Sequence, residues 1–114
     1  MASRGLQSSR QFRLVYSTGK REAGNRVVVY YLKREDGGVV PGFVASKKIG
    51  KACRRNRAKR LMREIFKRLE GCIAERNLWI VFIASFNPKE STFNEIYADV
   101  ERSLTRAGIL ISNG

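Results

Sequence analysis

The sequence predicts a small α+β protein, a sandwich of one central β-sheet with packed helices. Two runs of β-branched and aromatic residues, 27–32 and 39–45, have the composition of strands. A third run, 78–83, is almost continuously apolar, as expected for an interior strand. After Gly50 the hydrophobic period changes from 2 to 3.6, which indicates an amphipathic helix. The expected order is α-β-β-α-β-α, with room for one further short strand, in one domain spanning 1–114.

The first helix is expected over residues 8–18. Ser8 and Gln11 have the spacing of a capping box, and Gly19 follows as a stop signal. A helix this short is marginal in isolation. It must therefore pack against the rest of the protein.

The two strands that follow are predicted to form an antiparallel hairpin. The turn-like sequence Glu35-Asp36-Gly37-Gly38 separates the strand at 27–32 from the strand at 39–45. Both faces of the first strand are apolar, because Val28, Tyr30 and Leu32 alternate with Val27, Val29 and Tyr31. We expect both faces to be covered or used.

The central helix has two unlike faces and is expected to end at Gly71. Its apolar arc consists of Ala58, Leu61, Met62, Ile65 and Leu69, with Phe66 at the edge. Its opposite side carries Asn56, Lys59, Arg60, Arg63 and Lys67. One face is therefore predicted to be core and the other almost purely cationic.

The last helix is expected to begin at Thr92, which forms a capping box with Glu95, and to end before Gly108. The carboxylates Glu95, Asp99 and Glu101 are placed on its outer face. Cys72 is expected in the core, and residues 112–114 are expected to be a frayed end.

Positive charge is concentrated in one segment. The chain has 23 Lys and Arg against 10 Asp and Glu, for a net charge of +13. Residues 47–68 hold 11 of the basic residues and Glu64 as the only acidic one. Two other interpretations of this segment fit less well. A helix face that is merely solvated usually carries both positive and negative side chains. A helix that lies on a membrane needs a free apolar face, but here the core requires that face. We therefore expect a polyanionic partner.

The composition speaks against a protein active site. The chain contains no histidine, and no nucleophile is placed beside a base. Cys53 and Cys72 cannot supply a four-ligand zinc site, so no catalytic residue and no protein-bound metal or cofactor is expected. Residues 1–5 lack the apolar stretch of a signal peptide, and no run of about 18 apolar residues occurs. We expect a cytoplasmic protein that does not contact membranes.

Three aromatic residues allow two interpretations. Phe12 and Tyr16 share one side of the first helix, and Tyr31 lies in the first predicted strand. They can be core residues, or they can form a platform on which unpaired bases stack.

Residues 46–64, Ser-Lys-Lys-Ile-Gly-Lys-Ala-Cys-Arg-Arg-Asn-Arg-Ala-Lys-Arg-Leu-Met-Arg-Glu, closely resemble the bacterial ribonuclease P protein subunit. The family's RNR signature is Arg55-Asn56-Arg57, followed at the family's spacing by Lys59-Arg60 and Arg63. The resemblance implies a ribosomal protein S5 domain 2-like fold with a left-handed β-α-β crossover around this helix. It also implies removal of the 5′ leader of precursor tRNA, with hydrolysis performed by the RNA subunit and Mg²⁺.

The resemblance assigns two sets of RNA-binding residues. Contacts with ribonuclease P RNA are expected from Lys47, Lys48, Lys51, Arg54, Arg55, Asn56, Arg57, Lys59, Arg60 and Arg63. Contacts with the leader of precursor tRNA are expected from Phe12, Tyr16 and Tyr31. The free protein is expected to be a monomer. The alternative is a noncatalytic ribosomal or general RNA-binding protein, which composition alone does not separate from the first reading.

Overall fold

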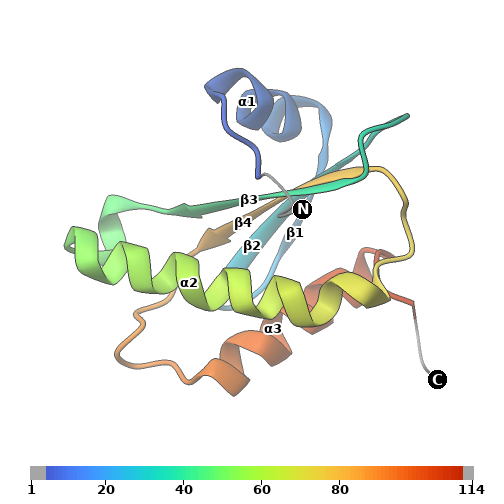
Figure 1. Cartoon of the computed structure of the whole chain (residues 1–114). Coiled ribbons are helices and arrows are strands. Elements are labelled where there is room, and N and C mark those ends of the chain that lie inside the picture. The colour runs from blue at the N-terminus through green and yellow to red at the C-terminus, as the bar shows by residue number, and fades with distance from the viewer. Residues whose placement is uncertain (1–4, 112–114) are drawn as a thin grey trace.

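The computed structural model describes residues 5–111, so the expected frayed end at 112–114 lies outside the described residues. Three helices and three of the four strands follow the predicted order, and the fourth, β1, is an additional short strand (Figure 1). The elements are α1 (Ser9–Thr18), β1 (Lys20–Ala23), β2 (Val27–Lys33), β3 (Val39–Ala45), α2 (Ala52–Leu69), β4 (Leu78–Ala84) and α3 (Phe93–Arg106). Short 3₁₀ turns at Lys47–Ile49 and Glu70–Cys72 flank α2. Both predicted capping boxes are present, at Ser8 and at Thr92.

The predicted hairpin between β2 and β3 is wrong. The sheet order is β1-β2-β4-β3, so β4 lies between the two strands and pairs antiparallel with β2 and parallel with β3. Two properties explain this order. β4 is apolar on both faces and needs an interior place, whereas Pro41 in β3 lacks an N–H and suits an edge strand. The hairpin in this fold is formed by β1 and β2.

The crossover from β3 through α2 to β4 is left-handed. The Leu78 side chain lies in the core on the α2 side, and its N–H donates to the carbonyl oxygen of Gly38 on the β3 side. In an upward strand with the side chain toward the viewer, the N–H of an L-residue points to the right. β3 therefore lies to the right of β4 with α2 in front, and the chain passes from right to left. This hand, expected from the family resemblance, is the opposite of that in nearly all parallel β-α-β units.

The sheet separates two apolar layers. Helices α2 and α3 cover one face, and α1 stands over part of the other (Figure 1). At the centre of the larger layer the ring of Phe82 stacks on Phe43 at 5.5 Å and meets Phe66 edge-on at 5.9 Å. Phe66, placed at the edge of the apolar arc from sequence, is buried here. Cys72, expected in the core, is only half-buried because it lies in the turn after α2.

Asp99 is buried, contrary to the prediction that it lies on the outer face of α3. Its side chain is only 2% exposed and accepts backbone N–H groups of Asn25, Arg26 and Val27 at 2.9 to 3.0 Å. Burial by itself would raise the pKa of Asp99, but these hydrogen bonds, with help from Arg102, hold it below its usual value. The carboxylate therefore fixes the turn between β1 and β2 to α3.

Candidate nucleic-acid interface

The predicted contacts with a polyanion belong to one continuous segment, which consists of the 3₁₀ turn at Lys47–Ile49, Lys51 and the first two-thirds of α2. We call this surface the cationic face. Its members are Lys47, Lys48, Lys51, Arg54, Arg55, Asn56, Arg57, Lys59, Arg60 and Arg63. Among residues 5–111, no carboxylate lies within ion-pair distance of any of its nine cations. Glu64, the acidic residue of this segment, pairs instead with Arg68 at 3.4 Å.

The N-terminus of α2 adds to the positive electrostatic potential of the cationic face. Lys51 is the N-cap residue and makes no side-chain cap, and no acidic residue occupies the first turn. A helix N-terminus carries partial positive charge and free N–H groups, which normally favour acidic side chains. Here basic residues occupy that end, so positive charges repel one another there and the site favours negative charge.

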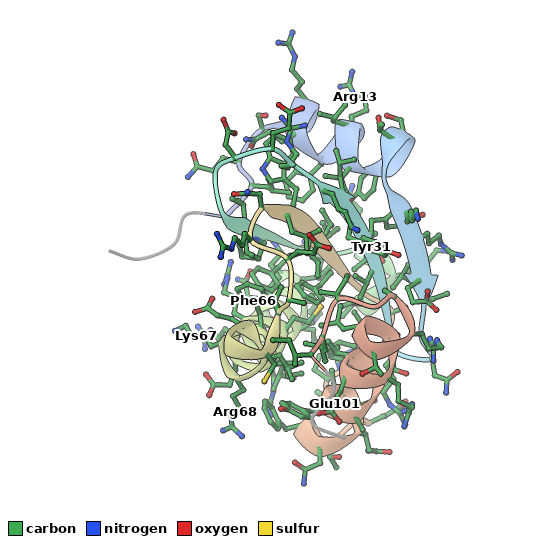
Figure 2. The ribbon with its side chains drawn as sticks, turned by 90° about the vertical axis from the view of Figure 1, so that its right-hand side faces the viewer. Arg13, Tyr31, Phe66, Lys67, Arg68 and Glu101 are labelled. Carbon is green, nitrogen blue, oxygen red and sulfur yellow. The ribbon has the colours of Figure 1, made fainter. Side chains whose placement is uncertain are left out.

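The opposite face of α2 explains why the cations are held in place. Ala58, Met62 and Ile65 are buried between α2 and the sheet, and Phe66 points inward while Lys67 and Arg68 point outward (Figure 2). The helix is therefore anchored by its apolar arc and cannot turn its basic side away from solvent.

The predicted aromatic set is only partly brought together. The rings of Phe12 and Tyr16 lie 6.4 Å apart on α1, and Tyr16 is 38% exposed. Tyr31, however, is 9% exposed and packs in the layer beneath α2 and α3, on the other face of the sheet. A platform made of all three aromatic residues needs Tyr31 on the same face as Phe12 and Tyr16, and the structure does not place it there.

Tyr30 takes the position that the prediction gave to Tyr31. Its ring meets Tyr16 edge-on at 4.9 Å, on the α1 face. Burial, with a smaller effect from Tyr30, raises the pKa of Tyr16 above its usual value. The alternation of β2 already placed Tyr30 and Tyr31 on opposite faces, but it did not indicate which face would be left open.

Beyond this aromatic pair, the α1 face of the sheet is incompletely covered. Val28, Ile83 and Val44 are half-buried, and no helix of the described residues lies above the end of β3 that leads to α2 (Figure 1). The open apolar strip therefore adjoins the beginning of the cationic face.

Within 5–111, no three His, Cys, Asp or Glu side chains are grouped so that they could hold a metal ion. None of the helices in this range is long and apolar enough to cross a membrane.

The fold, with its left-handed crossover, and the unpaired cationic face define a small basic protein of the RNA-binding class. The family model for ribonuclease P matches residues 1–108. The ribonuclease P protein component of Clostridioides difficile (strain 630) is 35% identical over 109 residues, which is 96% of each chain. This chain belongs to the ribonuclease P protein family.

Solved structures agree with this assignment. The RNase P protein of Staphylococcus aureus superposes with a TM-score of 0.83 at 30% identity, over 97% of this chain and 100% of that one. The RNase P protein of Thermotoga maritima superposes with a TM-score of 0.77 at 31% identity, over 90% and 96% of the two chains. The fold of this chain is thus the fold of the family.

Proposed function

We propose that this protein binds the catalytic RNA of ribonuclease P through its cationic face and contacts the 5′ leader of precursor tRNA on the α1 side of the sheet. The observation that carries the proposal is the set of nine cations with no described counter-ion, held on the 3₁₀ turn at Lys47–Ile49 and on the anchored helix that follows it. Phosphates of a folded RNA supply the missing negative charge, and Arg guanidinium groups match phosphate oxygens in geometry.

The leader is proposed to lie across the open strip of the α1 face. Phe12, Tyr16 and Tyr30 offer rings on which unpaired bases can stack, an interaction that tolerates any sequence. Tyr31 supports this platform from the core and does not take part in the stacking. Because mature tRNA lacks the leader, this strip favours precursor over product.

Hydrolysis is proposed to belong to the RNA subunit and its Mg²⁺. The chain has no histidine, and the carboxylates of Asp99 and Glu95 have structural roles. Asp99 holds a turn, and Glu95 completes the capping box of α3, where its hydrogen bonds with Thr92 and then the positive charge of Arg26 lower its pKa. The protein thus contributes binding and charge neutralisation, which lower the Mg²⁺ concentration that the complex needs.

This assignment also sets the expected state of the protein. We propose that residues 1–114 act as one RNA-binding domain, monomeric when free of RNA and working in the cytoplasm. Its partners are then ribonuclease P RNA and precursor tRNA.

Single-turnover cleavage of a leader-bearing precursor tRNA tests the proposal. The reaction contains bacterial ribonuclease P RNA at low Mg²⁺, with and without this protein. We expect cleavage at the mature 5′ end to require both components. Absence of stimulation across a Mg²⁺ titration, with folding verified by circular dichroism, would instead support a ribosomal or general RNA-binding protein. Cleavage by the protein without the RNA would indicate a solitary nuclease.

A further inference from the structure

A cavity at the outer edge of the sheet adjoins the aromatic residues of the α1 face and shares Phe12 with them. It has a volume of about 790 Å³ and lies where β3, the edge strand, passes between the N-terminal segment and α2. Leu6 and Phe12 line it on the α1 side, Phe43 lies on β3, and Arg63 and Phe66 line it on the α2 side. Lys67 completes the part contributed by α2, and Glu70, the first residue of the 3₁₀ turn after α2, lies next to it.

One pair of backbone groups faces into this cavity. Because the carbonyl of Gly38 points toward β4, alternation along the strand directs the N–H and C=O of Phe43 outward. Pro41 also points outward, but it has no N–H and its carbonyl already accepts the N–H of Leu6 at 2.8 Å. No described residue outside the sheet bonds to the peptide groups of Phe43. With respect to residues 5–111, the cavity therefore offers one unpaired donor and one unpaired acceptor, side by side.

Flat groups lie above and below this pair. The Phe12 ring packs over Gly42, where an added Cβ would come within 2.7 Å of it. On the other side, the Arg63 guanidinium lies over the Phe43 ring, 5.6 Å from its centroid. A planar group that continues the plane of the sheet would lie between an aromatic ring and a guanidinium. Proteins hold unpaired RNA bases in this way, stacked on aromatic or Arg planes and hydrogen-bonded along one edge.

We propose that this cavity is a pocket for one unpaired RNA nucleotide. The base edge pairs with the N–H and C=O of Phe43, and the phosphate lies near Arg63 and Lys67. Arg63 also belongs to the cationic face, so the strand that enters the pocket continues along α2. Glu70 repels phosphate and directs it toward the Arg63 end.

A peptide strand fits this edge less well than a base. Strand addition uses hydrogen bonds along several consecutive residues. Here Pro41 cannot donate and its carbonyl is occupied, so Phe43 alone provides both groups within the cavity. The cations beside it also favour a phosphate-bearing ligand.

Nuclear magnetic resonance on the ¹⁵N-labelled full chain tests the pocket. The probes are the four nucleoside 5′-monophosphates, with uridine and inorganic phosphate as controls. We expect at least one nucleotide to shift the Phe43 amide signal, and to do so more strongly than uridine or phosphate. Equal shifts with phosphate, no shift at millimolar nucleotide, or shifts confined to Tyr16 and Tyr30 would each overturn the proposal.

Charge variants at the pocket rim give opposite expectations. Lys67→Ala should weaken nucleotide binding by roughly two- to fivefold, the range of an exposed ion pair, and Glu70→Gln should strengthen it by a similar factor. Lys89→Ala removes the same charge as Lys67→Ala at an exposed site on the loop after β4 and should change nothing. Equal effects of Lys67→Ala and Lys89→Ala would show that only net charge matters, and the pocket would be refuted.

The proposal rests on the RNA-binding function proposed above, and the two can fail separately. Binding of ribonuclease P RNA is measured on the same samples. Intact RNA binding with an unresponsive Phe43 amide refutes the pocket alone. Failure of the unmodified protein to bind ribonuclease P RNA refutes both.

Discussion

Replacing Asp99 by Ala should destabilise the protein by about 2–4 kcal/mol. The carboxylate accepts three backbone N–H groups, and a hydrogen bond to a charged group contributes about 1.5–3 kcal/mol. These contributions do not simply add, because Asn25 and Arg26 lie in a turn where water can replace the carboxylate. Val27 is fully buried, so its N–H loses its partner without compensation.

Urea unfolding at neutral pH measures this loss, with Glu101→Ala as the matched control. Glu101 lies on the exposed side of the same helix and makes no ion pair with residues 5–111. Its removal should cost less than about 0.5 kcal/mol. If Asp99→Ala costs no more than Glu101→Ala, the carboxylate does not hold the turn and the reasoning is refuted.

The pH dependence of the same variant gives an independent check. The pKa of Asp99 is lowered in the fold, so its charged form contributes stability that is fully present above the ordinary Asp pKa. That contribution is lost as pH falls through the lowered value. The difference in stability between the unmodified protein and Asp99→Ala should therefore shrink in acid. A difference that stays constant down to acidic pH would contradict the ionised role.

Three further outcomes are expected. A filter-binding titration gives the slope of log affinity for ribonuclease P RNA against log salt concentration. Replacing both Arg60 and Arg63 by Ala should make this slope shallower by about 2, and an unchanged slope would show that neither residue contacts the RNA. Tyr16→Ala should weaken the binding of precursor tRNA to the holoenzyme by about 1–3 kcal/mol and leave the binding of mature tRNA unchanged, and equal losses for both tRNAs would assign Tyr16 a structural role. Tyr31→Ala, in contrast, should lower the urea midpoint of unfolding. Gly42→Ala should destabilise the fold by about 1–3 kcal/mol, because the added Cβ meets the Phe12 ring. A urea midpoint unchanged by the substitution would show that Phe12 does not pack there.

Local features of the fold could be predicted because they depend on residues close in sequence. The capping boxes at Ser8 and Thr92, the end of α1 at Gly19 and the two faces of α2 were all confirmed. Strand pairing could not be predicted in the same way. The glycines after β2 do reverse the chain, but the neighbour of each strand depends on β4, which lies more than thirty residues after β3.

The errors in the candidate site have the same origin. The helical period already places Asp99 near Ile96 and Ser103 on the buried arc of α3, but its charge favoured an outer position. Only the distant turn before Val27 provides the hydrogen bonds that make burial possible. Likewise, alternation separates Tyr30 from Tyr31, and only the placement of three helices shows which of them reaches the open face.

The central position of β4 has a consequence for how the protein is made. Synthesis proceeds from the N-terminus, so β1, β2, β3 and α2 leave the ribosome before Leu78–Ala84 does. Until then β2 and β3 have no strand between them, and the apolar arc of α2 has no completed sheet to cover. The basic residues of α2 are therefore exposed to cellular RNA while their scaffold is still missing. A nascent chain that stops before β4 would carry most of the positive charge of the protein without the fold that holds the basic side chains in a defined arrangement.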